Sequence, residues 1–417
     1  MNKIEIMAPA GSFESLRAAI DGGADSVYFG IGRLNMRSRS SQNFTTDDLA
    51  DIVSICNSAG VKSYVTLNTI VFDQELEEMK KVADACKTSG VSAVIAADPA
   101  VLSYLKSIGQ PTHISTQCNI TNIDAVRFYS LFAEVVVLAR ELSLEQVAAI
   151  VRQIDAEGIK GPSGEPVRIE LFAHGALCMA VSGKCYLSLD NMNSSANRGA
   201  CLQVCRRPYK VTDKEGEIEL SVDNEYIMSP KDLCTLPFLD RLIAAGVSVL
   251  KIEGRGRSAE YVKTVTRVYK EAAQAVADGV FTAGKRESWM RQLEGVYNRG
   301  FWGGYYLGQT MGEWSAGYGS QAKRRKLYIG KVTNYYGNLN VAEIKIETNA
   351  IKPGDVLIFN GPTTGSVEQT VHEVRLEFEP VAEAQKGNLC SVAVGSLVRR
   401  ADKVYKWVDS SGDESMG

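Results

Sequence analysis

The feature that most constrains the fold is a regular alternation of short apolar runs with longer amphipathic segments. Eight runs rich in β-branched and aromatic residues recur within the first 252 residues, and helix-length segments such as TTDDLADIVSICNSAG and SLEQVAAIVRQIDAEG separate them. Most of these segments start with a polar residue that can cap a helix and end with glycine. This alternation predicts a parallel sheet with helices outside it.

Eight β/α units in a single parallel sheet close most simply into a TIM-like (β/α)8 barrel. We predict its strands at residues 5–8, 26–29, 62–67, 93–96, 113–115, 134–138, 168–172 and 248–252. A long amphipathic segment, GRSAEYVKTVTRVYKEAAQAVADG, follows the eighth strand and is expected to close the barrel.

The chain changes character near residue 320. A segment rich in glycine and aromatic residues ends in a basic run at residues 323–326, and short strand-like runs without helical segments follow it. Glycine and asparagine turns separate these runs, so they predict a small β-barrel. We therefore expect two domains, a TIM-like barrel over residues 1–320 and a C-terminal β-barrel over residues 327–410.

Five of the nine cysteines fall close together, namely Cys178, Cys185, Cys201, Cys205 and Cys234. They belong to a cysteine-rich insertion, about residues 174–235, that follows the seventh predicted strand. The N-terminal sequence MNKIEIMAPAGS lacks the apolar run of a signal peptide, so we expect these thiols to stay reduced rather than form disulfides. Clustered thiolates of this kind indicate a metal or cluster site.

The spacing of these cysteines favours an iron–sulfur cluster over zinc. Zinc sites usually contain closely spaced ligand pairs, and in this segment only Cys201 and Cys205 approach that spacing. Four thiolates from a long loop suit a cubane cluster, because its corners lie farther apart than the ligands of a single ion. Zinc, which aerobic preparation could leave at the site, is the alternative.

Polar residues follow most of the predicted strands. In a barrel of this kind, chemistry takes place just beyond the C-terminal ends of the strands. The polar residues there, which we expect to face one cavity beneath the cysteine-rich insertion, are Asn68, Gln117, Arg140, His174, Glu253 and Arg255. The alternative is that they only face solvent, as strand ends often do.

Arginines gather on the same side of the predicted barrel. Their bidentate geometry suits an anionic substrate or an RNA backbone better than lysine does. They are Arg33, Arg37, Arg39, Arg198, Arg206 and Arg207.

Composition excludes several classes of protein. The formal net charge is only −3, so any contact with RNA must come from local patches rather than from a basic field over the whole surface. No apolar run reaches the length of a membrane span, and a hydrophobic content of 45% is ordinary for a globular protein. We expect a soluble cytoplasmic protein that does not contact membranes.

Four blocks of the sequence resemble one known family. The run E-x-F-x2-G-A-L-C-x4-G-x-C-x-L-S, from Glu170 to Ser188, resembles the signature of peptidase family U32, the collagenase-like proteases. The blocks MAPAGSFESLRAAIDGGADSVYFG, HISTQCN and KIEGR are similar to other parts of that family. The resemblance implies a 4Fe–4S cluster and the use of prephenate in making 5-hydroxyuridine in tRNA or 5-hydroxycytidine in ribosomal RNA.

The resemblance also implies three cluster ligands, because Cys178, Cys185 and Cys201 follow the family pattern in order. Cys205 and Cys234 compete for the fourth position. We expect Cys234 to be the ligand, because it opens a helix-like segment whose N-terminus would stabilise a thiolate. Cys205 is the alternative fourth ligand.

Three functions are compatible with these residues. A peptidase is disfavoured, because no H-E-x-x-H or G-x-S-x-G pattern occurs and Cys178, four residues after His174, is assigned to the cluster. A non-catalytic RNA-binding adaptor with a structural metal site is a second possibility. We favour an RNA hydroxylase that acts on tRNA, with ribosomal RNA as the alternative target, in which Arg140 or Arg255 holds the prephenate dicarboxylate. In that hydroxylase Tyr28 or Tyr186 would help to hold the target base.

Overall fold

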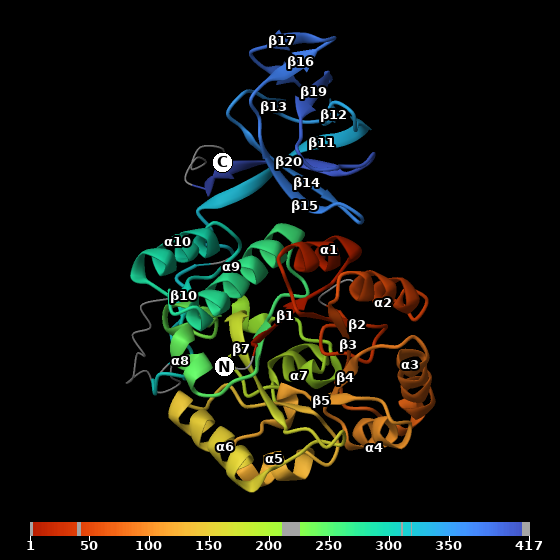
Figure 1. Cartoon of the computed structure of the whole chain (residues 1–417), viewed down its shortest axis with the longest axis vertical. Coiled ribbons are helices and arrows are strands. Elements are labelled where there is room, and N and C mark those ends of the chain that lie inside the picture. Colours follow the sequence, from red (N-terminus) through yellow and green to blue (C-terminus); the bar gives the residue numbers. More distant parts are fainter. Residues whose placement is uncertain (1–2, 40–42, 211–225, 310–311, 318, 411–417) are drawn as a thin grey trace.

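The computed structural model describes residues 3–39, 43–210, 226–309, 312–317 and 319–410. In these residues the first part of the chain forms a closed barrel of eight parallel strands (Figure 1). The strands are β1 (Glu5–Pro9), β2 (Ser26–Gly30), β3 (Lys62–Leu67), β4 (Ala93–Ala96), β5 (Thr112–Ile114), β6 (Val135–Val137), β7 (Arg168–Gly175) and β9 (Val249–Ile252). Because β9 pairs in parallel with both β1 and β7, the sheet has no free edge there. The predicted TIM-like barrel is confirmed.

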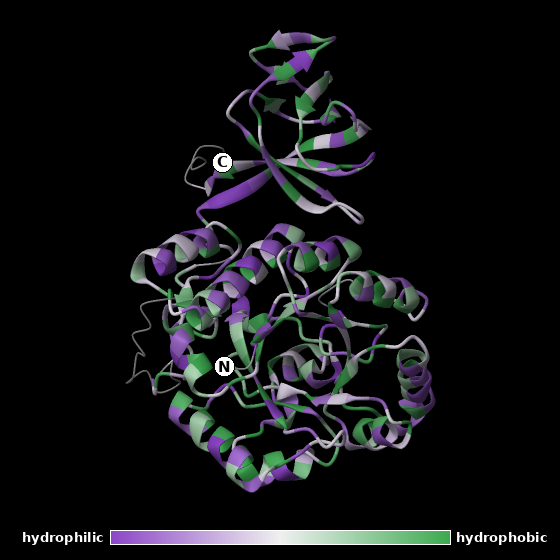
Figure 2. Cartoon of the chain, viewed as in Figure 1, coloured by the Kyte–Doolittle hydropathy of each residue, from purple (hydrophilic) through white to green (hydrophobic). Residues whose placement is uncertain are grey.

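Helices surround the barrel on its outer side (Figure 1). Figure 2 shows hydrophobic and hydrophilic residues alternating along them, as expected for helices that pack one face on a sheet. Several begin as the sequence predicts: Ser12 and Ser143 cap α1 and α6 through their side chains, and Asp98 caps α4. The helices are α1 (Phe13–Asp21), α2 (Leu49–Ser58), α3 (Leu76–Thr88), α4 (Pro99–Ser107), α5 (Ile123–Tyr129), α6 (Leu144–Glu157), α8 (Leu239–Ala244), α9 (Ala259–Ala277) and α10 (Ala283–Glu294).

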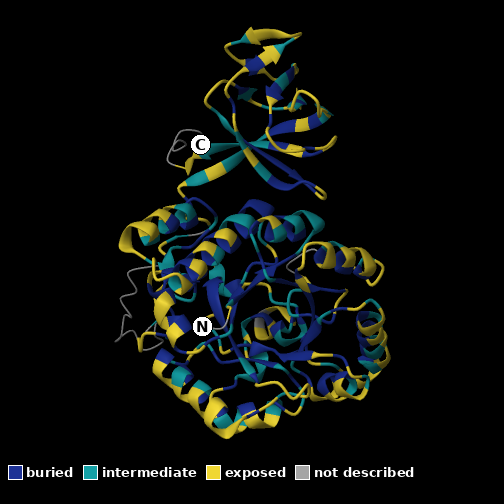
Figure 3. Ribbon diagram, viewed as in Figure 1, coloured by how far each residue is buried: buried dark blue, intermediate teal, exposed yellow. Residues whose placement is uncertain are grey.

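The interior of the barrel is packed rather than hollow. The barrel strands are almost entirely buried, whereas the outer faces of the helices are exposed (Figure 3). At the N-terminal ends of the strands, Glu5 accepts hydrogen bonds from Tyr64 (2.7 Å) and Arg168 (2.9 Å) and pairs with Lys62 at 3.3 Å. These contacts join β1, β3 and β7, so this end of the barrel is closed by a charged network.

The chain departs from a regular barrel after β7. No covering helix follows directly; the next described elements are the short α7 (Leu187–Met192), two 3-10 turns (Ala196–Arg198 and Val204–Arg206) and the three-residue strand β8 (Asp232–Cys234). β8 runs antiparallel to the end of β7, with His174 opposite Cys234, and β10 (Phe301–Trp302) pairs with β8. Cys234 therefore ends a strand and does not open a helix as expected. Residues 211–225 of the expected insertion lie outside the described residues.

The second part of the chain is an antiparallel sheet. Its order is β15-β14-β20-β11-β12-β19-β16-β17, and β13 pairs separately with β18. Since the end strands β15 and β17 do not pair with each other in the described residues, it is a sheet with edges and not the closed barrel expected. The strands are β11 (Arg324–Tyr336), β12 (Val341–Ile346), β13 (Ala350–Ile351), β14 (Val356–Gly361), β15 (Gly365–Thr370), β16 (Val374–Leu376), β17 (Glu379–Val381), β18 (Ala384–Gln385), β19 (Leu389–Ala393) and β20 (Lys403–Asp409).

The sheet contacts the barrel through α1 and α9. Lys263 donates a hydrogen bond to the Ser366 carbonyl at 2.7 Å, and Glu260 pairs with Lys326 at 2.9 Å. Gly365 lies so close to α1 that a Cβ there would be 3.0 Å from a side-chain carbon of Arg17. The two parts therefore meet at the side of the barrel. No described helix has the length and apolar character needed to cross a bilayer.

Candidate functional site

A pocket lies at the C-terminal ends of the barrel strands. It encloses about 240 Å³ and is lined by the ends of β2, β3, β7 and β9, by loops after β5 and β6, and by part of residues 176–206. Five of the six predicted mouth residues line it: Asn68, Gln117, Arg140, Glu253 and Arg255. They come from four strand ends, so the barrel brings together residues that lie far apart in the sequence.

An amide cluster forms one wall of the pocket. Asn68 donates hydrogen bonds to Ser115 Oγ at 3.0 Å and to Gln117 Oε1 at 3.2 Å, and its own Oδ1 accepts from the Met36 backbone N–H at 3.2 Å. Ser115 also donates a hydrogen bond to Gln117. These contacts fix the orientation of both amide groups.

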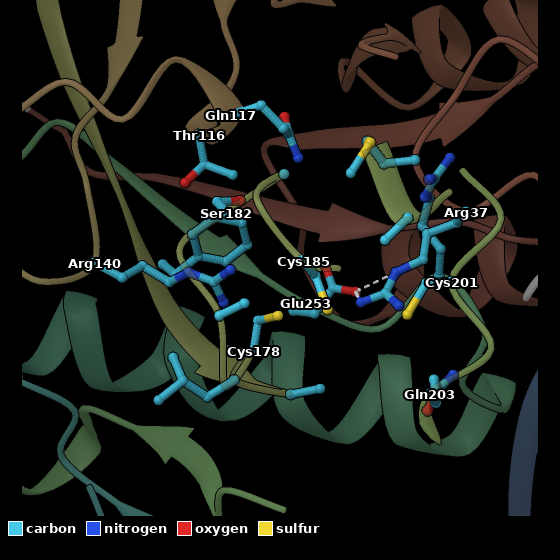
Figure 4. A pocket seen from close by; sticks show the side chains of 18 of the residues that line it. Arg37, Thr116, Gln117, Arg140, Cys178, Ser182, Cys185, Cys201, Gln203 and Glu253 are labelled. Carbon is cyan, nitrogen blue, oxygen red and sulfur yellow. Dashed lines mark hydrogen bonds and ion pairs between the residues drawn. The ribbon is translucent and has the colours of Figure 1, made fainter. Parts of the chain in front are cut away.

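An ion pair forms another part of the pocket wall. Arg37 Nη2 lies 2.7 Å from Glu253 Oε1, and Tyr28 donates to Glu253 Oε2 at 3.2 Å. Burial alone would raise the pKa of Glu253, but Arg37, Arg255 and Arg140 outweigh it and lower that pKa. Figure 4 shows Arg140 on one side of the pocket, Arg37 with Glu253 on the other, and Cys178 between them. The sequence placed Arg37 on this side of the barrel but did not reveal its partner.

Arg255 is packed against two glycines, Gly30 at its guanidinium and Gly11 at its backbone carbonyl. Its Nη1 donates to Thr66 Oγ1 at 2.9 Å, and a Cβ at Gly30 would lie only 2.3 Å from that nitrogen. A Cβ at Gly11 would lie 2.0 Å from the Arg255 carbonyl oxygen. Burial lowers the pKa of Arg255 to about 10, although Tyr28 and Glu253 oppose that shift. Any side chain at either glycine would displace this arginine.

Sequence reasoning missed two charged residues inside the barrel. Lys251 of β9 lines the pocket, and Glu170 of β7 pairs with it at 2.8 Å. A signal was present, because a charged residue in the middle of an apolar strand is rarely buried without a specific partner. Each residue lies in such a strand, Glu170 in RIELF and Lys251 in VLKIE.

Residues 176–206 are held over the pocket by two arginines. Arg198 forms an ion pair with Glu75 at 2.6 Å and stacks on the Phe72 ring at 3.8 Å. Arg206 donates to the Leu177 carbonyl at 2.6 Å and to Ser229 Oγ at 3.0 Å. Both arginines thus have partners within the protein, which gives them a structural role besides the predicted one in binding anions.

Four thiols face this pocket, and they belong to Cys178, Cys185, Cys201 and Cys205. Cys178 is exposed and the other three are partly buried. Burial raises the pKa of the Cys205 thiol to about 11; Arg206 opposes this, and the charges of the other three thiols add to it. All four cysteines line this one pocket.

The spacing of these thiols matters for what they could hold. No group of three or more His, Cys, Asp or Glu side chains in the described residues is arranged to hold a metal ion. A site for a metal ion is therefore not preformed in the described residues, and what the pocket lining shows is that the four thiols belong to one cavity.

Cys234 and His174 lie elsewhere, against α9 and α10. The Cys234 sulfur is 3.8 Å from Tyr269 Oη and 3.9 Å from Met290 Sδ, and only 2% of the residue is exposed. His174 Nδ1 lies 3.4 Å from the same Tyr269 hydroxyl, and burial lowers the pKa of His174 to about 3, so its ring is neutral at physiological pH. Neither residue lines the pocket, so the expectation that His174 faces the mouth is wrong, and the fourth thiol beside Cys178 is Cys205.

Positive charge dominates the pocket. Its lining contains seven Arg or Lys side chains and a single carboxylate, that of Glu253. Arg257, one of the seven, stacks on Tyr297 at 3.6 Å. Cations that are held in place around a small cavity favour an anionic ligand, particularly one with carboxylate or phosphate groups. The cationic residues are Arg37, Arg140, Arg206, Lys251, Arg255, Arg257 and Arg299.

Known proteins resemble this chain along most of its length. The profile of peptidase family U32 matches residues 11–316. A protein named collagenase from Porphyromonas gingivalis is 54% identical over 407 residues, or 98% of each chain. The tRNA hydroxylation protein P1 of Bacillus subtilis is 31% identical over 380 residues, which is 89% of this chain and 87% of that protein. A 23S rRNA 5-hydroxycytidine synthase of Escherichia coli is 37% identical over 278 residues, 66% of this chain and 40% of the synthase.

Proposed function

Because this chain belongs to peptidase family U32 and is similar to proteins named for tRNA and rRNA hydroxylation, we propose that it hydroxylates a pyrimidine in RNA. The proposed product is 5-hydroxyuridine in tRNA, with 5-hydroxycytidine in ribosomal RNA as the alternative. The observation that carries the proposal is the pocket itself, which combines four thiols with seven cationic side chains.

In this proposal the thiols of Cys178, Cys185, Cys201 and Cys205 hold a 4Fe–4S cluster. When bound, the cluster would supply a redox centre, which the twenty side chains lack. Cys205 replaces Cys234 as the fourth ligand, because it lines the pocket with the other three thiols and Cys234 is packed against Tyr269.

The cationic side chains would bind a small dicarboxylate co-substrate, which we propose to be prephenate. Arg140 and Arg255 are suited to this task, since neither forms an ion pair with an acidic residue in the described part of the chain. The amide cluster of Asn68 and Gln117 offers donors and acceptors of the kind that recognise the edge of a base. A base flipped out of its stack could enter past the exposed ring of Tyr186.

The ligand assignment is tested by iron content. Alanine variants of all five cysteines are purified without oxygen, and iron and visible absorbance are measured. We expect Cys205→Ala to lose most of its iron, as Cys178→Ala does, and Cys234→Ala to keep it. Loss of iron from Cys234→Ala with retention by Cys205→Ala would reverse the assignment of the fourth ligand.

A second candidate function is collagenase-type proteolysis, which the name of the relative at 54% identity favours. In the described residues His174, the histidine nearest in sequence to Cys178, contacts Tyr269 instead, so the geometry of a cysteine protease is absent there. Hydrolysis of gelatin by purified wild-type protein, abolished in Cys178→Ala, would support this candidate instead.

A further inference from the structure

Lys251 places an ammonium group on the floor of the pocket. The side chain projects from β9 into the barrel, is only 6% exposed and lies among aromatic rings, with its Nζ 4.6 Å from the centre of the Tyr28 ring and 5.6 Å from that of Phe172. Burial of a charged amine is costly unless it gains specific partners. Its position therefore needs an explanation.

Glu170 supplies only part of that explanation. Its Oε1 lies 2.8 Å from Lys251 Nζ, and its side chain is fully buried and does not line the pocket. The Glu170 carboxylate thus contacts the Lys251 ammonium on the side away from the pocket. An ammonium has three N–H donors, and within the described ranges Glu170 is the single hydrogen-bond acceptor that Lys251 contacts.

Arg140 contacts the same aromatic ring as Lys251. Its guanidinium lies 4.9 Å from the centre of the Phe172 ring, and it forms no ion pair with an acidic residue in the described part of the chain. Two cations with unused donors therefore lie beside one ring in one small cavity. Both cations line the same small cavity, so both have donors available to an anion bound there.

A purely structural role explains these contacts less well. A buried ion pair usually adds little stability compared with apolar residues of the same size, because desolvation offsets the attraction between the charges. A pair that exposes only its cation to a pocket is better suited to binding an anion.

We infer that Lys251 is a substrate-binding residue: together with Arg140 it binds one carboxylate of a small dicarboxylate, and Glu170 positions its ammonium. This inference rests on the proposed function for the identity of the ligand, prephenate, but not for the existence of the anion site.

The test is calorimetric titration of prephenate, and separately of malonate, into protein purified without oxygen. We expect Lys251→Met to bind at least about tenfold more weakly than wild type, since a hydrogen bond to a charged group contributes about 1.5–3 kcal/mol. Lys62→Met is the matched control, because Lys62 pairs with Glu5 at the closed end of the barrel and should bind like wild type. Iron content is measured in each variant, so that loss of the cluster is not mistaken for loss of the anion site.

Lys251→Met leaves the Glu170 carboxylate buried without its partner and could fail to fold. The double variant Glu170→Gln/Lys251→Met removes both charges and keeps the volume nearly constant, and we expect it to show the same weak binding. Equal affinity of wild type and both variants would overturn the inference. It would also be overturned if the wild type bound neither of the two dicarboxylates. Binding of malonate but not prephenate, with the same dependence on Lys251, would support the anion site and refute prephenate as the co-substrate.

Discussion

Glu5 makes a specific prediction about acid stability. This carboxylate joins β1 to β3 and β7 at the closed end of the barrel through Tyr64, Lys62 and Arg168. Burial alone would raise its pKa, but the Tyr64 hydrogen bond and the two cations lower it from the ordinary 4.5 to about 2. Because its pKa is lower in the folded state, the stabilisation is complete above pH 4.5 and is lost as the pH falls towards 2.

The size of the effect follows from the same shift. A pKa difference of about two and a half units corresponds to about 3 kcal/mol of stability at neutral pH, of which about 1 kcal/mol is lost by about pH 3.5. Urea unfolding of wild type and Glu5→Gln, followed by fluorescence at neutral pH and at about pH 3.5, measures it. Glu287→Gln, on the exposed face of α10, is the control for removal of a surface charge. The reasoning is refuted if the two proteins differ by the same free energy at both pH values.

Three further predictions concern the contact between the C-terminal sheet and the barrel, and the pocket. Gly365→Ala should lower the melting temperature more than Gly387→Ala: both glycines have positive φ, 71° and 92°, but only at Gly365 would the new Cβ contact α1. An equal fall in melting temperature for the two variants would show that the contact of residue 365 with α1 does not contribute to stability. Glu253→Gln should lower kcat/KM about tenfold with iron content unchanged, because Arg37 loses a charged acceptor that orients it; unchanged kinetics would remove this ion pair from the site. His174→Gln should cost stability but keep iron and the KM for RNA, because the ring lies outside the pocket; a large rise in KM would return His174 to the binding site.

The barrel was predictable because its signals are local. Each strand carries its own run of apolar residues, and several helices carry both a capping residue and an amphipathic face in their own sequence. The strand ends were predictable for the same reason, so Asn68, Gln117 and Arg140 could be assigned to one mouth. Their hydrogen-bond partners were not, because those depend on how neighbouring strand ends meet.

His174 departs from the usual alternation along a strand, in which every second side chain points to the same side. Glu170 contacts Lys251 and Phe172 lines the pocket, and a regular strand would point His174 to the same side. The pairing of β7 with β9 shifts its register between Phe172 and His174. Such an irregularity changes the direction in which the side chain points, and no feature of the sequence RIELFAHG predicts it.

Cys234 was misplaced because β8 is defined by long-range pairing. The sequence DLCTLPFLDRLIAAG has the pattern of a helix preceded by a cap, and its first three residues form a strand because they pair with the end of β7 and with β10, both far away in the sequence. The Arg37–Glu253 pair was beyond sequence reasoning for a similar reason, since 216 positions separate its members. In the second part of the chain, the short runs predicted the strands, but the expected closure into a barrel is not seen in the described residues, because it depends on pairing between the distant strands β15 and β17.

The central claim is that this chain hydroxylates a pyrimidine in RNA with a cluster held by its clustered thiols. The most direct measurement is mass spectrometry of nucleosides from tRNA and ribosomal RNA of a strain that lacks the gene, complemented with wild type or with Cys178→Ala. We predict that 5-hydroxyuridine disappears from tRNA in the deletion strain, returns with wild type and does not return with Cys178→Ala. If both 5-hydroxyuridine and 5-hydroxycytidine were unchanged in the deletion strain, the claim would be contradicted.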